Sequence, residues 1–366
     1  MKIPILELKP TYLELQEEID AAYHRVMNSG WYLLGEETRA FEEEYAAYIG
    51  TRHCVSVANG LDAIRIALSA HGIGPGDEVI VPAQTFIATW LAVTQCGATP
   101  VGVDIGESGS NLDPALLPAA LTPRTRAIVP VHLYGQPADM EPILAFARAH
   151  GLVVIEDAAQ AHGARYRGRR CGTLGHSAAF SFYPGKNLGA FSDAGAITTD
   201  DDEVARKARM LRNYGSEKRY YHDLPGINSR TDELHAAFLR VKLRHLDEWN
   251  ARRAGLAGQY RQTVLPPPFI LPSVPEWAEP VWHLFVIRHP ERDLLQRFLA
   301  ERGIQTMIHY PIPPHRSEAY RPLGYAPGSF PVAERLAGEI LSLPIGPHIT
   351  PEQAAVVADA LKAFTA

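Results

Sequence analysis

This chain of 366 residues has little of several features that would place it in a specialised class of protein. Its three cysteines, Cys54, Cys96 and Cys171, lie far apart, so neither a disulfide framework nor a zinc-binding spacing is indicated. No apolar run is long enough to cross a bilayer, and residues 1–8 lack the apolar centre of a signal peptide. The chain also lacks a dense Lys/Arg cluster, and its formal net charge is −6. We therefore expect a cytoplasmic protein that binds neither membranes nor nucleic acid.

The composition, 46% hydrophobic and 21% charged, is that of an ordinary globular protein. Short apolar segments alternate with helical patterns along the first two thirds of the chain, which predicts an α/β fold with a mainly parallel, helix-covered sheet. The expected strands are 54–58, 78–82, 100–104, 127–131, 152–156, 178–182 and 194–199.

The length allows two domains with separate cores. A helix beginning near residue 233 is expected to lead into a smaller unit, in which 283–288 reads as a strand and Val357, Leu361 and Phe364 form the apolar stripe of a last helix. We predict a large α/β domain over 14–245 and a smaller α+β domain over 246–366, with residues 1–13 packed on the small one.

Lys186 lies in an unusual setting. The segment 179–190, Ala-Phe-Ser-Phe-Tyr-Pro-Gly-Lys-Asn-Leu-Gly-Ala, runs from a strand-like stretch into a loop of small residues. Most loop lysines are simply solvated, but an amine in this position also suits covalent chemistry. Asp157 follows an apolar strand, where an aspartate is more often a helix cap. A reactive lysine together with a carboxylate for a ring nitrogen is what pyridoxal 5′-phosphate (PLP) requires.

A phosphate site is expected where a strand ends and a helix begins, at Asn59-Gly60-Leu61-Asp62. The free N–H groups of a first helical turn bind anions, and Gly60 lets the backbone approach closely, although an ordinary helix cap explains the same pattern. Ser181, just before the lysine loop, could donate its hydroxyl to the same phosphate, but a serine in a strand is usually structural.

Two further residues suit the cofactor ring. Phe86 follows an expected strand and could lie flat on the ring, although a core position would explain a phenylalanine equally well. Gln160, three residues after Asp157, could donate a hydrogen bond to the ring hydroxyl.

Together these motifs resemble the DegT/DnrJ/EryC1/StrS sugar aminotransferases, and the resemblance covers essentially the whole chain. The segments that carry it are 29–35 (Ser-Gly-Trp-Tyr-Leu-Leu-Gly), 59–63 (Asn-Gly-Leu-Asp-Ala), 131–136 (Val-His-Leu-Tyr-Gly-Gln), 156–163 (Glu-Asp-Ala-Ala-Gln-Ala-His-Gly), 181–189 (Ser-Phe-Tyr-Pro-Gly-Lys-Asn-Leu-Gly) and 226–230 (Gly-Ile-Asn-Ser-Arg).

The resemblance implies a type I PLP-dependent (aspartate-aminotransferase-like) fold and a set of roles. Lys186 would form the Schiff base and carry the proton, and Asp157 would pair with the ring nitrogen. Gln160 would contact the ring hydroxyl, and Phe86 would stack on the ring. The resemblance also places the backbone amides of Gly60 and Leu61 and the hydroxyl of Ser181 on the phosphate, and Asn228 on the phosphate of a neighbouring subunit, which implies a homodimer with shared active sites.

Contacts to the sugar substrate are expected from tyrosine, lysine and histidine side chains in loop-like segments, although such residues are commonly structural. They are Tyr32, Tyr183, Lys218, Tyr220, Tyr221, His309, Tyr310 and His315. The spacing of His309 and His315 does not suit a metal site, and we expect no metal.

The family implies transfer of an amino group from L-glutamate, leaving 2-oxoglutarate, to a nucleotide-linked keto-sugar. Many members have Thr where this chain has Leu61, so a hydroxyl contact is missing here. Leu61, together with Gln-Ala-His after Asp157, resembles the branch that aminates C3 of deoxy-keto sugars, dTDP-linked ones above all. The alternatives are a 4-keto-sugar aminotransferase and a regulatory PLP-binding homologue without turnover.

Other enzyme classes fit less well. A nucleotide-sugar dehydrogenase would need a Gly-x-Gly-x-x-Gly turn after its first strand, and none is present. A sugar dehydratase of the same family would have His in place of Lys186, and a cysteine desulfurase would need a cysteine in an exposed loop.

Overall fold

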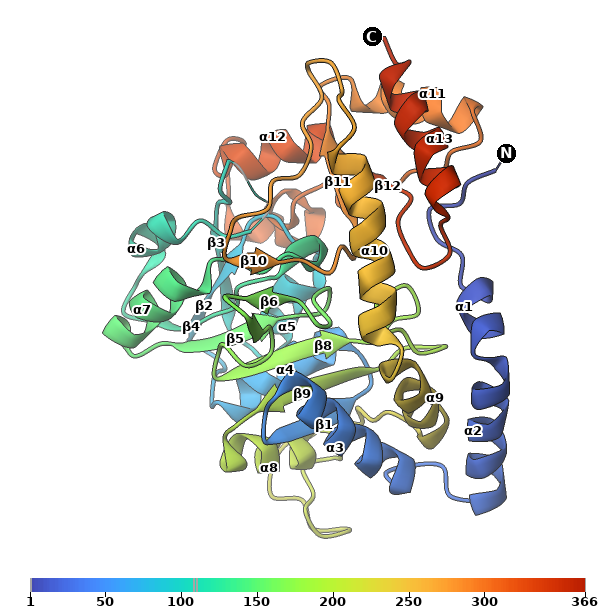
Figure 1. Cartoon of the computed structure of the whole chain (residues 1–366). Helices are drawn as coiled ribbons and strands as arrows, with labels where there is room; N and C mark the ends of the chain where they lie inside the picture. Colours follow the sequence, from blue (N-terminus) through green and yellow to red (C-terminus); the bar gives the residue numbers. More distant parts are fainter. Residues whose placement is uncertain (1, 108, 110, 366) are drawn as a thin grey trace.

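The computed structural model describes residues 2–107, 109 and 111–365. A twisted sheet with helices on both faces forms its centre, and a smaller group of helices and strands lies beside one end (Figure 1). Within the described residues the main sheet has seven strands in the order β1-β9-β8-β5-β4-β2-β3. β9 runs antiparallel to both of its neighbours, whereas the pairs among β8, β5, β4, β2 and β3 are parallel, which confirms a mainly parallel α/β sheet.

The bounds of the elements follow. The strands are β1 His53–Val57, β2 Glu78–Pro82, β3 Thr99–Val103, β4 Thr125–Ile128, β5 Val153–Asp157, β6 Arg165–Tyr166, β7 Arg169–Arg170, β8 Ser177–Ser181, β9 Gly195–Thr199, β10 Ala278–Glu279, β11 Phe285–Arg288 and β12 Ile340–Leu343. The α-helices are α1 Lys9–Glu14, α2 Gln16–Ser29, α3 Glu36–Ile49, α4 Gly60–Ala70, α5 Ala88–Gln95, α6 Leu117–Ala120, α7 Met140–His150, α8 Asp202–Leu211, α9 Glu233–Leu243, α10 Leu246–Arg261, α11 Arg292–Glu301, α12 Pro331–Glu339 and α13 Pro351–Lys362. Short 3₁₀ turns are η1 Pro114–Leu116, η2 Leu133–Gly135, η3 Pro314–Arg316 and η4 Glu318–Leu323.

The strands of the main sheet are apolar on both faces because both faces are covered. In β8, Ala178 and Phe180 join the core under α3, α7 and α9, whereas Ala179 between them joins the core under α4, α5 and α8. Successive side chains of a strand point to opposite faces, so a strand buried on both sides has no polar alternation. This is why the strands could be recognised as short continuous apolar runs.

The expected strands are all present, and the largest difference is in β4. This strand was expected to reach Val131 but ends at Ile128. Pro130 has no N–H with which to continue the ladder. Val131 then forms a single parallel bridge with Asp157.

The smaller group has a core of its own. β11 and β12 pair antiparallel, and α11 and α13 pack on them together with the C-terminal half of α10. The helix expected from residue 233 is interrupted at Arg244 and His245, so that α9 stays on the main sheet and α10 makes the connection. Ile3 forms a bridge with Ile304 and lies in the small core. These contacts agree with the division proposed at residue 245, which stays a prediction.

The parallel strands direct their carboxyl ends to one edge of the sheet. β5 ends at Asp157, β8 ends at Ser181, and β1 leads into Asn59 and Gly60. In open α/β sheets, ligands bind outside this edge.

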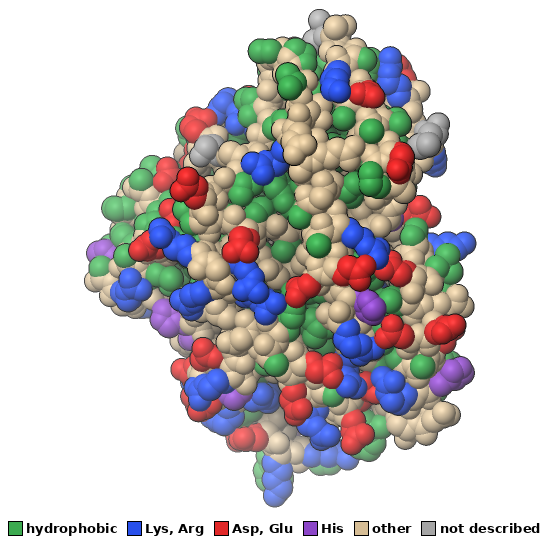
Figure 2. All heavy atoms as spheres, in the orientation of Figure 1, with side chains coloured by type: hydrophobic (Ala, Val, Ile, Leu, Met, Phe, Trp, Pro, Cys, Tyr) green, Lys and Arg blue, Asp and Glu red, His purple; other side chains and the backbone are tan. Residues whose placement is uncertain are grey.

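The surface is charged without being dominated by one sign. Figure 2 shows basic and acidic side chains interspersed over the visible face, as the small net charge suggests. Among the residues described, no helix has both the length and the apolar character needed to span a membrane.

Candidate active site

The Lys186 loop follows β8 at the carboxyl edge of the sheet. The Lys186 N–H donates to the Tyr183 carbonyl at 2.8 Å, which closes a tight turn through Pro184 and Gly185. The side chain is partly buried. Burial lowers the pKa of the Lys186 amine to about 8, and the charge of Asp157 opposes this shift. An appreciable fraction of the amine is therefore unprotonated near neutral pH, as a nucleophile requires.

Asp157, at the end of β5, is buried with two of its four lone-pair sites in use. Its Oδ2 accepts from the Thr89 hydroxyl at 2.8 Å, and its Oδ1 accepts from the Ala159 N–H at 3.2 Å. Burial raises the pKa of Asp157, while the Thr89 hydroxyl, the Ala159 N–H and the charge of Lys186 act in the opposite direction. A cationic partner would complete the site, because it would hold the carboxyl ionised.

The first turn of α4 forms a cradle for an anion. Asn59 caps the helix, its side chain accepting from the Asp62 N–H at 2.8 Å. The N–H groups of Gly60 and Leu61 have no acceptor among the described residues. A Cβ at Gly60 would lie 2.6 Å from the Cβ of Ser181, so only glycine allows β8 and α4 to approach this closely. Two free amides beside a serine hydroxyl fit a phosphate.

The phosphate cradle is tied to the segment that carries Asn228. The Ser229 hydroxyl oxygen accepts from the Ala58 N–H at 3.0 Å, and the Thr231 hydroxyl donates to the Val57 carbonyl at 2.7 Å. Asn228 directly precedes these two hydrogen-bonded residues and follows the largely exposed loop 214–227. Its own side chain is exposed.

Gln160 links several site residues. Its Oε1 accepts from the Tyr134 N–H at 2.6 Å, and its Nε2 donates to the Tyr310 hydroxyl at 3.1 Å. One of the two amide protons remains available for a ligand. The half-exposed ring of Phe86 lies 5.2 Å from the ring of Tyr310. Phe86, Gln160 and Tyr310 thus form one cluster, as the sequence predicts for the first two.

The pKa of three histidines near Lys186 is lowered by burial and then by its charge, so they add no positive charge near neutral pH. Burial, followed by the nearby Lys186 charge, lowers the pKa of His309 to about 4 and that of His162 to about 3. The same two causes lower the pKa of His283 well below its usual range. His309 also shares a hydrogen bond of 2.8 Å with the Ser342 hydroxyl through Nδ1.

Among the described residues, no side-chain hydrogen bond joins the remaining substrate candidates to Lys186, Asp157 or Gln160, although the Tyr183 carbonyl accepts from the Lys186 N–H. Tyr32 and Tyr183 are half-exposed, and Tyr220 and Tyr221 are exposed in the loop that also holds Lys218, whose ammonium lies 4.8 Å from the Tyr221 ring. His315 is buried against Phe330 and shares a hydrogen bond of 3.1 Å with Glu334, which favours a packing role. The substrate roles of all these residues stay predictions.

One buried group has the composition of a metal site. Ligand atoms of His132, Glu156 and Cys171 lie within 4.8 Å of one another. However, His132 Nδ1 accepts from the Ala138 N–H, so its Nε2–H must donate to Glu156, at 2.9 Å. Both imidazole nitrogens are therefore already used, and the group is better explained as a hydrogen-bonded core cluster.

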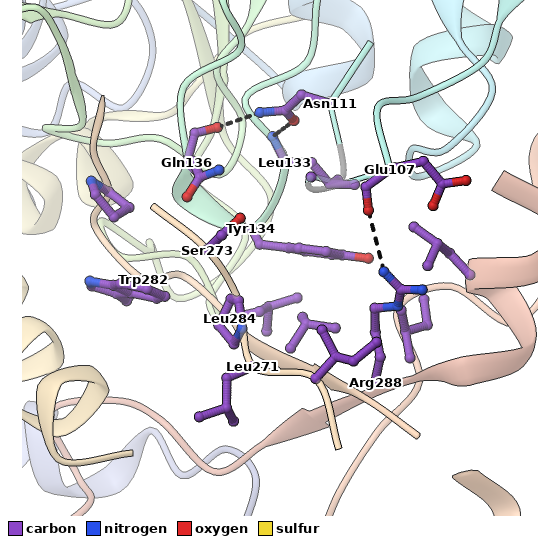
Figure 3. Close-up of a pocket in the computed structure, with 17 residues that line it drawn as sticks. Glu107, Asn111, Leu133, Tyr134, Gln136, Leu271, Ser273, Trp282, Leu284 and Arg288 are labelled. Atoms are coloured by element: carbon purple, nitrogen blue, oxygen red, sulfur yellow. Dashed lines mark hydrogen bonds between the residues drawn. The ribbon is translucent and has the colours of Figure 1, made fainter. Parts of the chain in front are cut away.

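A cavity of about 270 Å³ lies beside the site, between η2, which belongs to the main-sheet region, and β11 of the smaller group (Figure 3). It is lined mainly by apolar side chains, including Leu133, Trp282 and Leu284. Tyr134 forms part of its wall, and the same residue donates its N–H to Gln160. Tyr134 therefore connects this cavity, which lies between the main-sheet region and the smaller group, to Gln160 of the candidate active site.

Thr89, Tyr134, Asn187 and His283 were not predicted from the sequence. Thr89 is three residues after Phe86, in a helix whose other buried positions are largely apolar, and this isolated buried hydroxyl is the signal that could have identified it. Tyr134 has a positive φ of 61°, which is unusual for a tyrosine and is not visible in the sequence.

The donor set fits PLP. Free amides and a hydroxyl suit its phosphate, a half-satisfied buried carboxylate suits its ring nitrogen, and an amine with lowered pKa suits its aldehyde.

Comparison with known proteins agrees with this geometry. The family model for the DegT/DnrJ/EryC1/StrS aminotransferase family matches residues 13–362. The chain is 57% identical over 364 residues to the "Erythromycin biosynthesis sensory transduction protein EryC1" of Saccharopolyspora erythraea, covering 99% of this chain and 100% of the relative. It is 55% identical over 364 residues to the dTDP-3-amino-3,4,6-trideoxy-alpha-D-glucose transaminase of Streptomyces venezuelae, covering 99% and 96%.

A solved structure extends the agreement to three dimensions. The crystal structure of S. venezuelae DesV in complex with a ketimine intermediate superposes with a TM-score of 0.97 at 55% identity, covering 99% of this chain and 98% of that one. Type I PLP-enzyme architecture, PLP dependence and aminotransferase activity follow from the family match and this likeness together. The chain belongs to the DegT/DnrJ/EryC1/StrS aminotransferase family.

Proposed function

We propose that this aminotransferase transfers the amino group of L-glutamate to a dTDP-linked 3-keto-6-deoxy sugar and so produces a 3-amino sugar. The observation that carries the proposal is the complete donor set around Lys186 in a chain 55% identical to a transaminase named for a dTDP-3-amino-trideoxy-glucose. Leu61 at the start of α4 stands in place of the Thr that the family resemblance associates with the 4-keto branch, which supports the 3-keto substrate.

PLP, when bound, supplies an aldehyde carbon that bonds to amines and a protonated ring that withdraws electrons from the adjacent carbon. In our proposal the amides of Gly60 and Leu61 and the hydroxyl of Ser181 hold its phosphate. Asp157 would pair with the ring nitrogen and keep it protonated, and the free amide proton of Gln160 would bond to the ring hydroxyl. Phe86 would stack on the ring.

Lys186 has two tasks in this proposal. Its Nζ would hold the aldehyde of the cofactor covalently, and when free it would accept a proton from the amino-acid donor and give it back in the course of the transfer. A pKa of about 8 suits both directions, because such an amine accepts and releases protons readily near neutral pH. The neutral His162, His283 and His309 add no positive charge that would depress its basicity further.

An absorbance experiment tests the reaction. The purified protein should be yellow, and L-glutamate should bleach the band while 2-oxoglutarate forms. Lys186→Ala should lose the band and at least about 100-fold of turnover, whereas Lys207→Ala, at a partly exposed position of α8, should keep both. Unchanged transamination by Lys186→Ala would refute the assignment.

The sugar is tested with the bleached enzyme. dTDP- and UDP-linked 3-keto and 4-keto sugars should be compared for their ability to restore the yellow band, and the dTDP-linked 3-keto sugar is expected to act fastest. Faster recovery with a 4-keto sugar would favour the alternative substrate. The regulatory alternative has one argument in its favour, the name of the 57% identical relative, and bleaching by glutamate would count against it.

We further propose a homodimer in which Asn228 of one subunit completes the phosphate site of the other. Exposed Asn228 and the exposed aromatic residues Trp31, Tyr220 and Tyr221 support this arrangement. Mixing Lys186→Ala with Asn228→Ala subunits should restore up to about a quarter of wild-type activity, since half of the dimers are mixed and each has one intact site. No recovery in mixed dimers of confirmed mass would place Asn228 in its own subunit's site or outside both.

A further inference from the structure

The side chain of Asn187, next to the candidate catalytic lysine, is a buried hydrogen-bond hub. It is 4% exposed. Its Nδ2 donates to Asn250 Oδ1 at 2.8 Å and to the Val281 carbonyl at 2.9 Å. Both amide protons are therefore used, and the amide orientation is fixed because neither partner oxygen is a donor.

This orientation determines the protonation of His283. The remaining polar atom, Asn187 Oδ1, can only accept, and it lies 3.1 Å from His283 Nδ1. The proton of the neutral imidazole must then be on Nδ1, which leaves the lone pair on Nε2. The hub is satisfied with this tautomer and with no other.

The partners of Asn187 come from the segments that join the two parts of the chain. Asn250 lies on α10, and its own Nδ2 donates to the His162 carbonyl at 2.8 Å, in the segment that follows Asp157. Val281 and His283 belong to the stretch that leads into β11. Figure 3 shows Trp282 and Leu284 at the cavity beside the site. His283, which lies between them in the sequence, does not line that cavity but bonds to Asn187.

We propose that Asn187 is a positioning residue, which fixes the Lys186 loop to α10 and to segment 281–283 and thereby sets where the lysine amine lies. The inference rests on the proposed role of Lys186. Asn187 is joined to Lys186 by one peptide bond, so a displaced hub moves the lysine directly. A second tie, from the Lys242 ammonium to the Gly189 carbonyl at 2.7 Å, holds only the far end of the loop.

The chain offers a matched control in Asn111. Its Nδ2 donates to the carbonyls of Gln136 and Pro137 at 3.0 and 2.9 Å, and its Oδ1 accepts from the Leu133 N–H at 3.0 Å. Two of these bonds are visible in Figure 3. Asn111 thus also donates two bonds and accepts one, beside the cavity and away from the lysine loop, but its partners all lie in the main-sheet region.

The experiment compares Asn187→Leu with Asn111→Leu, two neutral changes of similar size. Both should lower the melting temperature to a similar degree. In Asn187→Leu alone, the pH midpoint of the yellow band should move by about half a unit or more, and PLP should leave the dialysed protein about tenfold faster. If both variants keep the wild-type midpoint, or move it equally, Asn187 is merely structural and the inference fails.

Two further measurements keep the test decisive. If Asn187→Leu does not fold, His283→Leu, which removes one of the three bonds, should still move the midpoint relative to wild type and to Asn111→Leu; no movement would refute the proposal. In ¹⁵N-labelled wild-type protein without PLP, the His283 proton should be found on Nδ1, and finding it on Nε2 would overturn the hub geometry. A wild-type protein without a yellow band would instead refute the proposed role of Lys186.

Discussion

Glu156 and Asp157 are neighbours in β5, yet the structure treats the two carboxylates in opposite ways. Glu156 is fully buried and accepts four hydrogen bonds, from the N–H groups of Gly172, Leu174 and Gly175 and from His132 Nε2, at 2.7 to 2.9 Å. Asp157 points to the other face of the sheet and accepts two.

The difference separates structural from functional acids. A carboxylate has about four lone-pair sites, so Glu156 is saturated by its own chain and has nothing left to offer a ligand. Asp157 keeps about half of its capacity, at a cost in stability that a bound cation would offset. The number of donors around a buried acid is therefore more informative about its role than its burial.

Asp157→Asn should have the largest effect. We expect turnover to fall by at least about 100-fold, because the negative charge at the ring nitrogen is lost. The apo-protein should be as stable as wild type or more so at neutral pH. Since burial raises the folded-state pKa of Asp157, its contribution to stability is present in acid and is lost as pH rises through that pKa, and the variant has no such loss. Steady-state rates and thermal unfolding at pH 5 and pH 8 would show both effects.

Glu156→Gln should instead keep turnover and lose stability, by about 3 kcal/mol in the free energy of unfolding. The new amide hydrogens would face donors that cannot accept them, namely a backbone N–H and His132 Nε2–H. Denaturant unfolding measures the loss, and the folded fraction should keep its activity within a few-fold. A stable Glu156→Gln protein with lost activity would contradict the distinction drawn here.

Thr89→Val sharpens the comparison, because it removes one of the two donors to Asp157 while keeping the shape of the side chain. We expect about a tenfold loss of turnover, the effect of one hydrogen bond to a charged group. The pKa of Asp157 should rise further, so activity should fall at a higher pH on the acid side than in wild type. The pH–rate profile tests this, with Thr94→Val at the other end of α5 as the control.

The smallest expected effect is a difference in chemical labelling between two lysines, Lys186 and Lys242. Burial lowers the pKa of Lys186 and of Lys242 to about 8 in each case. Lys242 is buried, with its ammonium bonded to Gly189 and lying 3.9 Å from the centre of the Phe191 ring. Reductive labelling of the apo-protein at pH 8 should modify Lys186 and spare Lys242, as peptide mass spectrometry would show. Equal labelling would mean that the pKa alone, and not access, decides reactivity.

Much of the architecture could be predicted because its signals are local. Strands such as 178–182 are continuous apolar runs, and Asn59-Gly60 is a recognisable helix start. The end of β4 could not be located from apolarity, because Val131 continues the run while Pro130 interrupts the ladder.

The candidate site shows the same limit. Lys186, Asp157 and Gln160 stand out through their spacing, whereas Thr89 and Asn187 act through contacts with residues distant in sequence. Asn187 looked like one small polar residue of a loop, and only the approach of α10 and segment 281–283 reveals its three bonds. His315, which stood out as a histidine in a loop-like segment, is packed against Phe330, a contact that the sequence does not reveal, and its substrate role stays a prediction.

The pairing of Ile3 with Ile304 has a mechanical consequence. Helix α2 packs on α9 of the main sheet, so the first residues of the chain run between the two parts alongside α10. The N-terminal segment and α10 thus both connect the smaller group to the main sheet, and together they restrict its rotation more than α10 alone would. A movement of the smaller group relative to the main sheet would therefore have to bend or strain both connections.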